Sequence, residues 1–208
     1  MPRGVDAELF QPAKRTRKPD DGERILGYVG RLSIEKNIGL LVEIQKELDR
    51  MGTKNFRFVI VGHGGDEAWL REHLAGAEFT GVLRGEALAA AYANMDLFVF
   101  PSHTDTFGNV VLEALASGVP AIVTPDGGPR TIIGDSHSGR DGKIGRIVTD
   151  EQFAAAIAEL IDDPVRLAEM RKAAREYALT ASWDSVFEGI YAAYRDLSHV
   201  ASRSSTAD

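Results

Sequence analysis

Short apolar runs alternate with longer amphipathic stretches along most of this 208-residue chain. The runs are continuously apolar, which is typical of strands that are buried on both faces of a sheet. We expect strands at residues 25–30, 56–62, 78–81, 97–102, 121–124 and 145–148. Strand followed by helix, repeated about five times, predicts a parallel sheet with right-handed crossovers. The predicted fold class is therefore α/β, a doubly wound and Rossmann-like parallel sheet.

The segments between these runs have helical spacing. Leu41, Ile44 and Leu48, for example, fall on one face of a helix. We expect helices at residues 38–51, 66–75, 86–95 and 109–117, with a turn into another helix at Gly127-Gly128-Pro129. The helix that starts at Asn109 should end at Gly118, shortly before Pro120.

The last third of the chain is predicted to be mostly helical, with a break at Asp163-Pro164. Ser182 can cap a final helix. The apolar face of that helix would consist of Val186, Ile190, Tyr194 and Leu197. Residues 11–24 are polar, charged and proline-containing, so they are expected to form a linker or an exposed arm.

Composition excludes several classes of function. There are 31 acidic and 24 basic residues, which argues against broad nucleic-acid binding because that needs an excess of cations. The absence of cysteine excludes disulfides, thiolate nucleophiles and Cys-ligated zinc. No apolar run approaches the roughly 20 residues of a membrane-spanning helix, and the first residues lack the apolar core of a signal peptide. A cytoplasmic location is expected, with peripheral membrane contact left open.

Most unusual residues lie in loops that follow the predicted strands, where doubly wound sheets bind ligands. In the first loop, GRLSIEKN, Arg31 and Lys36 suit a diphosphate, although they also suit a solvated loop. In the second, Gly62 and Gly64 permit close approach of a ligand or form a plain turn. Glu67 occupies the third glycine position of G-x-G-x-x-G, so a dinucleotide site is only weakly indicated.

The run DTFGNVVLE places one acid in a loop and another in the helix that follows. The helix starting at Asn109 offers free amides and a dipole to a phosphate or sugar oxygen, and Gly108 permits close approach. Glu113 is a lone acid on an otherwise apolar helix. It suits a ribose diol if it faces a cleft, and otherwise it is a solvent-facing residue. The loop TPDGGPRTII is either another wall of the pocket or a connecting turn.

The five histidines form no H-x-x-x-H or H-E-x-x-H motif, so no metal site is predicted. Ser102 and His103 adjoin, but no G-x-S-x-G is present, and a serine-hydrolase triad is not indicated. The basic residues Lys14, Arg15, Arg17 and Lys18 belong either to a solubilising linker or to a contact with anionic lipid.

In order, these segments resemble the C-terminal half of retaining GT-B glycosyltransferases, the large "glycosyl transferases group 1" family of glycogen, sucrose-phosphate and phosphatidylinositol-mannoside-type enzymes. RGVDAELFQP resembles the interdomain segment of that family, and GRLSIEKN resembles its diphosphate loop. VGHGGDEAWL, TDTFGNVVLEALASGVPAIVT and SWDSVFEGIYAAY resemble its glycine loop, its acidic signature and its closing helix. Five motifs in register, over almost the whole chain, make the resemblance specific.

The resemblance implies a role for each matching position. Arg31 and Lys36 would neutralise the donor diphosphate, Glu113 would hold the ribose hydroxyls, and Asp105 would hold the sugar hydroxyls. The remaining donor contacts that it implies are Gly30, Gly62, Gly64, Val82, Leu83, Thr106, Phe107, Gly108, Asn109 and Val110. Val82 and Leu83 belong to the loop against which the base would lie. The implied donor is a UDP- or GDP-sugar whose hexose is transferred with retention, without a cofactor or a metal ion.

The resemblance also implies a domain organisation. Residues 1–24 would be an interdomain segment, residues 25–180 the nucleotide-sugar-binding domain of a GT-B fold, residues 181–199 a C-terminal helix, and residues 200–208 a tail. The family's N-terminal domain, which binds the acceptor and often supplies a catalytic histidine, has no counterpart in this chain. We therefore expect the chain alone to bind its donor weakly and to transfer little.

Two departures from the family pattern affect the site. Asp105 stands where the family usually has Glu, so the sugar contact is one methylene shorter. Pro129 and Arg130 follow the paired glycines where the family often has Glu.

Two other functions fit the same fold, namely a non-catalytic nucleotide-binding module and half of a nucleotide-sugar epimerase.

Overall fold

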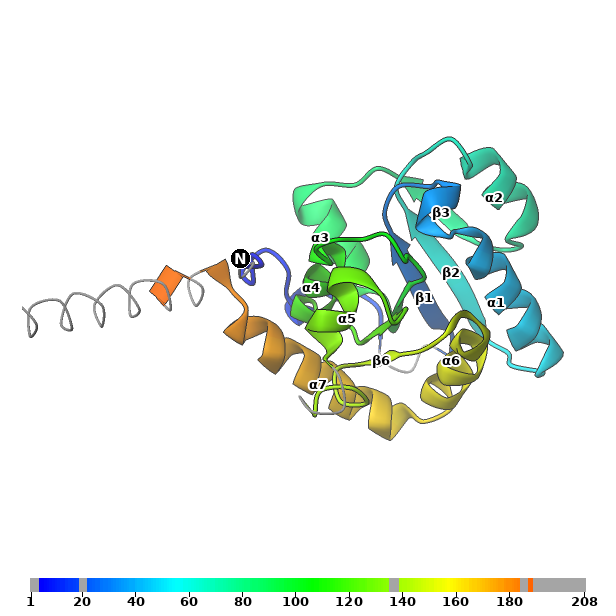
Figure 1. The fold of residues 1–208 in the computed structure, drawn as a ribbon. Helices are drawn as coiled ribbons and strands as arrows, with labels where there is room; N and C mark the ends of the chain where they lie inside the picture. The colour runs from blue at the N-terminus through cyan, green and yellow to red at the C-terminus, as the bar shows by residue number, and fades with distance from the viewer. Residues whose placement is uncertain (1–3, 19–21, 135–138, 184–186, 189–208) are drawn as a thin grey trace, which may run out of the picture.

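Six strands form a parallel sheet in the order β3-β2-β1-β4-β5-β6 (Figure 1). The computed structural model describes residues 4–18, 22–134, 139–183 and 187–188. The strands are β1 (Arg24–Val29), β2 (Phe56–Val61), β3 (Glu78–Gly81), β4 (Leu97–Phe100), β5 (Ala121–Val123) and β6 (Gly145–Ile147). The chain winds outward from β1 to β3 and then from β4 to β6, which confirms the doubly wound, Rossmann-like fold class.

Helices cover both faces of this sheet. Their bounds are η1 (Pro12–Lys14), η2 (Ile34–Lys36), α1 (Gly39–Arg50), α2 (Glu67–His73), α3 (Gly85–Ala93), α4 (Asn109–Ala116), α5 (Gly127–Ile133), η3 (Asp150–Gln152), α6 (Phe153–Ile161) and α7 (Pro164–Thr180). Helices α1, α2 and α6 lie together on one face, and α3, α4 and α5 lie on the other (Figure 1). The long helix α7 packs along α4.

The core explains why the strands are continuously apolar. Every residue of β4 and β5 is buried, because helices cover both faces of the sheet at these central strands.

Helix ends also follow the sequence signals. The Asp163 side chain accepts a hydrogen bond from the Arg166 amide at 2.9 Å, and Pro164 is the first residue of α7. The predicted break at Asp163-Pro164 is therefore confirmed.

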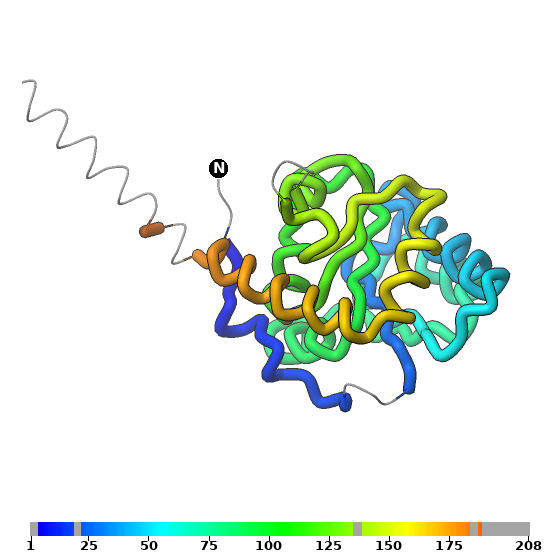
Figure 2. The backbone as a smooth tube through the Cα atoms, turned by 90° about the horizontal axis from the view of Figure 1, so that it is seen from below, coloured from blue at the N-terminus to red at the C-terminus, as the bar shows by residue number. Residues whose placement is uncertain are grey.

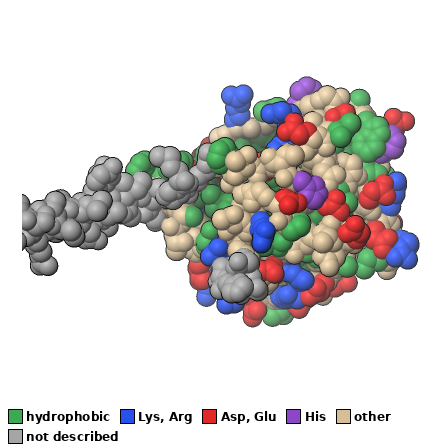
Figure 3. Space-filling view, in the orientation of Figure 1, with side chains coloured by type: hydrophobic (Ala, Val, Ile, Leu, Met, Phe, Trp, Pro, Cys, Tyr) green, Lys and Arg blue, Asp and Glu red, His purple; other side chains and the backbone are tan. Residues whose placement is uncertain are grey.

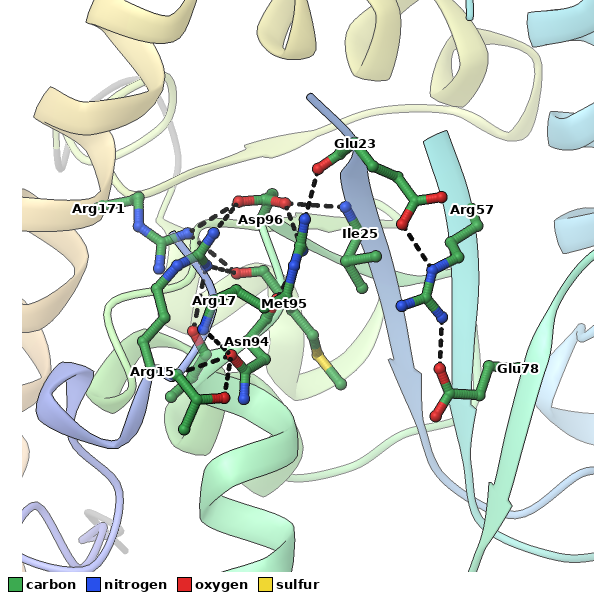
Figure 4. Close-up of polar contacts among 12 residues, drawn as sticks. Arg15, Arg17, Glu23, Ile25, Arg57, Glu78, Asn94, Met95, Asp96 and Arg171 are labelled. Atoms are coloured by element: carbon green, nitrogen blue, oxygen red, sulfur yellow. Dashed lines mark hydrogen bonds and ion pairs between the residues drawn. The ribbon is translucent and has the colours of Figure 1, made fainter. Parts of the chain in front are cut away.

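Residues 11–18 are bound to the domain, so the prediction of an exposed arm is wrong for this part of the segment. The side chains of Arg15 and Arg17 are only 13% and 17% exposed. They contact the two oxygens of Asp96 at 2.8 and 3.1 Å, and Asp96 also accepts from the Ile25 amide at 2.8 Å (Figure 4). This cluster joins the starts of β1 and β4, at the amino edge of the sheet.

The first described residues lie beside the end of α7 (Figure 1 and Figure 2). The Val5 amide donates to the Ala181 carbonyl at 3.0 Å. Arg175 of α7 donates to the carbonyls of Phe10 and Ala116 at 2.8 and 2.7 Å. The expected apolar face of a final helix, at Val186, Ile190, Tyr194 and Leu197, lies outside the described residues, as does the expected tail at residues 200–208.

Charged side chains of both signs are interspersed over the face of the molecule drawn in Figure 3. Within the part of the chain that the structure describes, no helix combines the length and the apolar character needed to cross a membrane.

Candidate functional site

Loops from four strands meet at the carboxyl edge of the sheet, as the parallel topology predicts. The Thr104 hydroxyl, in the loop after β4, donates to the Glu35 carbonyl in the loop after β1 at 3.2 Å. The Gly128 amide, after β5, donates to the Asp105 carbonyl at 2.9 Å. The Leu32 amide donates to the His63 carbonyl of the loop after β2 at 3.1 Å. These contacts build one continuous surface from loops that are distant in sequence.

Lys36 and Asp105 form an ion pair at the centre of this surface. Lys36 Nζ lies 3.3 Å from Asp105 Oδ2, and the side chains are 16% and 23% exposed. Asp105 Oδ1 accepts hydrogen bonds from the amides of Phe107 and Gly108, at 3.1 and 2.6 Å. Burial alone would raise the pKa of Asp105, but these two amides and the charge of Lys36 outweigh it and lower the pKa. Asp105 is thus an ionised carboxylate with both oxygens engaged.

Helix α4 begins directly after this carboxylate. Gly108 has φ +69°, in the left-handed region that favours glycine. A Cβ at Gly108 would lie only 2.7 Å from Ile132 Cδ1 and 3.1 Å from Pro129 N, so a side chain would displace Ile132 and crowd the backbone at Pro129. The amides of Asn109 and Val110 belong to the first turn of α4, where N–H groups have no partner within the helix. They give this point of the surface a positive character.

Glu113 lies one turn into α4 and is held by a buried tyrosine. Its Oε2 accepts a hydrogen bond from the Tyr92 hydroxyl of α3 at 2.9 Å. Burial raises the pKa of Glu113, and the hydrogen bond from Tyr92 opposes that effect only in part. Tyr92 is absent from the predicted site, although it is the one aromatic side chain in the Ala-rich helix α3. Glu113 is therefore neither a fully buried nor a solvent-facing residue.

Arg31 takes a different position from Lys36. Its guanidinium is 68% exposed and lies 3.9 Å from Glu35, whereas its backbone carbonyl accepts from the buried Tyr28 hydroxyl at 2.9 Å. Burial, with a smaller effect from the charge of Asp105, raises the pKa of Tyr28 far above its ordinary value, so that this hydroxyl keeps its proton. The structure thus fixes the backbone of Arg31 and leaves its side chain at the surface.

The glycines of the first two loops allow the loops to pack on each other. A Cβ at Gly62 would lie 1.9 Å from the carbonyl oxygen of Gly30, and one at Gly64 would lie 2.0 Å from the carbonyl oxygen of Leu32. Real Cβ atoms do not approach so closely, which accounts for glycine at both positions. The predicted contact of these glycines with a ligand stays a prediction.

The other predicted residues lie around this centre. Val82 and Phe107 are 61% and 51% exposed, and Thr106 and Asn109 are also exposed. Leu83 and Val110 are partly buried and pack against the core.

A second cluster, which the sequence did not reveal, lies beside the Lys36–Asp105 pair. The two ring nitrogens of His103 lie 2.7 Å from Asp126 Oδ2 and 3.0 Å from Asp150 Oδ1. Asp150 also accepts from the Asn37 side-chain amide at 3.2 Å. Only the position of His103 within the loop hinted at this arrangement, because its carboxylate partners are 23 and 47 residues away. Among the described residues, no group of three or more His, Asp or Glu side chains is arranged to hold a metal ion.

Known proteins are similar to this chain in sequence and in fold. The family model "Glycosyl transferases group 1" matches residues 10–179. A GDP-mannose-dependent alpha-mannosyltransferase from Corynebacterium glutamicum is 37% identical, over 94% of this chain and 46% of that protein. Sucrose-phosphate synthase from Thermosynechococcus elongatus has a similar structure, with a TM-score of 0.76 and 25% identity, over 96% of this chain and 52% of the other.

The C-terminal domain of a glycosyl transferase group 1 family protein from Francisella tularensis has the same fold, with a TM-score of 0.70 and 23% identity. That match covers 85% of this chain and 97% of the other. The chain spans about half the length of the curated relatives it matches first.

Proposed function

The chain belongs to the glycosyl transferases group 1 family and corresponds to its C-terminal domain, and from this premise we propose that it binds the nucleotide-sugar donor of a retaining glycosyltransferase. The observation that carries the proposal is the position of Lys36 and Asp105 at the start of α4. A half-buried cation, an ionised carboxylate and a helix N-terminus together suit a ligand that carries both phosphate and hydroxyl groups.

In this proposal the departing nucleoside diphosphate is stabilised by the protein itself. Negative charge grows on the diphosphate as the sugar leaves, and fixed positive groups lower the energy of that state. Lys36 and the first-turn amides of α4 supply such groups. Arg31, which is exposed beside Glu35, turns toward the diphosphate when the donor binds. Side chains and amides then take the part that a metal ion plays elsewhere.

Asp105 binds a sugar hydroxyl by exchanging its contact with Lys36 for one with the sugar. Its Oδ1 is held by the amides of Phe107 and Gly108, while its Oδ2 faces Lys36. When Lys36 moves to the diphosphate, Oδ2 becomes available to a sugar hydroxyl. Glu113 takes the ribose hydroxyls through Oε1, since Oε2 already accepts from Tyr92. The base lies against Val82 and Leu83.

The relative that is named GDP-mannose-dependent supports a GDP-hexose, and GDP-mannose first, as the donor. The match to that relative covers 94% of this chain.

Calorimetric titration of the chain with GDP, UDP and ADP, and then with GDP-mannose and UDP-glucose, tests the proposal. We expect GDP and GDP-mannose to bind. Lys36→Ala should weaken both by about tenfold or more, because hydrogen bonds to charged groups are worth about 1.5–3 kcal/mol. Glu113→Gln should weaken both less, because it keeps the acceptor for Tyr92. Lys46→Ala is the matched control, since Lys46 is an exposed lysine of α1 that pairs with Glu43. Equal binding by all variants would refute the site.

We further propose that a separate N-terminal domain binds the acceptor, because the chain spans about half of its relatives. The chain alone then binds the donor but transfers sugar slowly. Turnover by this chain at the rate of a complete transferase would contradict that division. Where transfer is reconstituted, the anomeric configuration of the product, read by NMR, tests retention.

A further inference from the structure

Four polar side chains from three loops form a linked hydrogen-bond cluster beside the Lys36–Asp105 pair. The cluster consists of Asn37, His103, Asp126 and Asp150. We propose that His103, held as an imidazolium between two carboxylates, is a positioning residue that fixes the two loops carrying Lys36 and Asp105 and makes donor affinity depend on pH. This inference rests on the proposed function for its link to the donor, but the geometry of the cluster stands by itself.

Hydrogen-bond accounting requires two protons on the His103 ring. Nδ1 lies 2.7 Å from Asp126 Oδ2 and Nε2 lies 3.0 Å from Asp150 Oδ1. Carboxylates only accept, and a neutral imidazole carries a single N–H, so both contacts exist together only in the imidazolium form. Consistent with this geometry, the hydrogen bond to Asp126 raises the pKa of His103, with partial burial opposing it and Asp150 adding to it.

The carboxylate of Asp126 connects His103 to the loop that carries Asp105. Asp126 immediately precedes Gly127 and Gly128, and the Gly128 amide donates to the Asp105 carbonyl at 2.9 Å. A Cβ at Gly127 would lie 2.3 Å from that same carbonyl oxygen, so the two backbones are in direct contact. His103 itself lies two residues before Asp105. Asp126 and His103 are therefore both connected to the backbone of Asp105.

The carboxylate of Asp150 connects His103 to the loop that carries Lys36. Asp150, at the start of η3, accepts from the Asn37 side-chain amide at 3.2 Å, and Asn37 directly follows Lys36. The same amide of Asn37 donates to the Pro101 carbonyl at 3.2 Å, which ties the loop after β1 to the end of β4. Asn37 has φ +54°, a left-handed conformation that asparagine tolerates better than most residues.

The charged groups that act on the ring are Asp126, after β5, and Asp150, at the start of η3. Lys36, in the neighbouring loop, is engaged with Asp105. The His103 side chain is 40% exposed, so it exchanges its proton with solvent. When the ring loses a proton, one of its two contacts is lost. The loops that hold Lys36 and Asp105 are then no longer joined through His103.

Calorimetry of GDP-mannose binding between about pH 6 and about pH 9 tests the proposal, because this range spans the titration of a histidine. Wild-type affinity should fall as the pH rises through the pKa of His103. His103→Gln should bind about tenfold more weakly at the acidic end and show little change with pH, since it lacks the charge. His103→Arg keeps the charge throughout, so it should remain tight and lose the pH dependence. His73→Gln, which alters an exposed histidine stacked on Trp69 in α2, should behave as wild type.

Proton NMR of the His103 ring gives a readout that does not depend on the donor. Its pKa should lie above that of a free histidine, and the backbone amides of Lys36 and Asp105 should shift over the same pH range. These shifts should be absent in His103→Gln. If the ring titrates as a free histidine, or if His103→Gln keeps the wild-type pH dependence, the proposal is overturned. If the ring and both amides titrate as expected but no donor binds at any pH, the proposed function fails instead.

Discussion

Glu113 shows how a single residue can oppose the stability of the domain that contains it. Its carboxylate is partly buried between α3 and α4, and the described residues give it one hydrogen bond, from Tyr92. Burial raises its pKa, so ionising it is harder in the folded chain than in the unfolded chain. A carboxylate in such a place weakens the fold at neutral pH, which is a common property of binding sites.

Glu113→Gln should therefore raise the free energy of unfolding by about 1 kcal/mol at neutral pH while weakening donor binding. Glutamine keeps an oxygen that accepts from Tyr92 but carries no charge. Urea unfolding of both proteins as a function of pH checks this. Because the folded pKa is raised, the carboxyl is neutral in both states below the unfolded pKa, and the penalty grows as the pH rises above it. A wild-type protein that is more stable than the variant at neutral pH would contradict the argument.

At the scale of elements, the site is shaped by loops whose backbones touch. Gly62 and Gly64, after β2, lie against the carbonyls of Gly30 and Leu32, after β1. The Asp66 side chain then accepts from the Ile34 amide at 2.8 Å, which joins the start of α2 to the same loop. Backbone contact leaves little room for adjustment, so the position of Lys36 is set by neighbouring elements as well as by its own loop.

Adjacent glycines provide a matched test of this packing. A Cβ at Gly64 would lie 2.0 Å from the carbonyl oxygen of Leu32, whereas one at Gly65 would meet nothing within 4 Å. Gly64→Ala should lower the free energy of unfolding by at least about 2 kcal/mol, as overpacking does. Gly65→Ala should change it by less than about 0.5 kcal/mol. Similar denaturation midpoints for the two variants would show that the loops separate easily.

The elements themselves were largely predictable from sequence. Apolar runs placed each of the six strands to within about two residues, because burial on both faces leaves a strong local signal. The order of the strands is not encoded in those runs, and it followed only from the rules for parallel α/β folds. Residues 11–18 were misread because their composition is that of a linker, while the carboxylate that binds them, Asp96, is about 80 residues away.

At the scale of the whole molecule, the Asp96 cluster and the candidate site lie at opposite edges of the sheet. Asp96 precedes β4 and contacts Arg15, Arg17 and the Ile25 amide at the amino edge (Figure 4). Asp105 follows β4 at the carboxyl edge. Arg171 of α7 also approaches Asp96, at 3.7 Å, and burial together with the nearby Arg15 lowers its pKa to about 10. This cluster joins the N-terminal segment, the starts of β1 and β4, and α7, and it does not contact the candidate site.

Asp96→Ala should lower the free energy of unfolding by about 3–5 kcal/mol, because it leaves partly buried arginines without their carboxylate. The folded fraction should still bind the donor as wild type does, since the site is at the other edge. Asp49→Ala, which changes an exposed aspartate of α1, is the control and should have little effect. Denaturant unfolding and calorimetry on the same samples check both parts. A loss of donor affinity in folded Asp96→Ala would show that the two edges are coupled.

The candidate site was only partly predictable. Lys36 and Asp105 were predicted as one site because each follows a buried strand, and the structure brings them within 3.3 Å. Tyr92 and the cluster around His103 were missed, since their partners are joined by the fold and not by spacing in the sequence. A lone histidine in a loop carries no local sign of the carboxylates that will face it.

The glycine-packed loops have a consequence for how this domain can change over evolutionary time. The packed backbones of these loops fix the shape of the site. Ile34, in the loop after β1, and Val82, in the loop after β3, lie at its surface and are 81% and 61% exposed. Substitutions at such tips cost little stability, because surface positions away from packed contacts tolerate change. New side chains can therefore be selected at positions 34 and 82 while the packed loop backbones stay unchanged. A small library at these two positions is the natural starting point for altering which ligands the domain accepts.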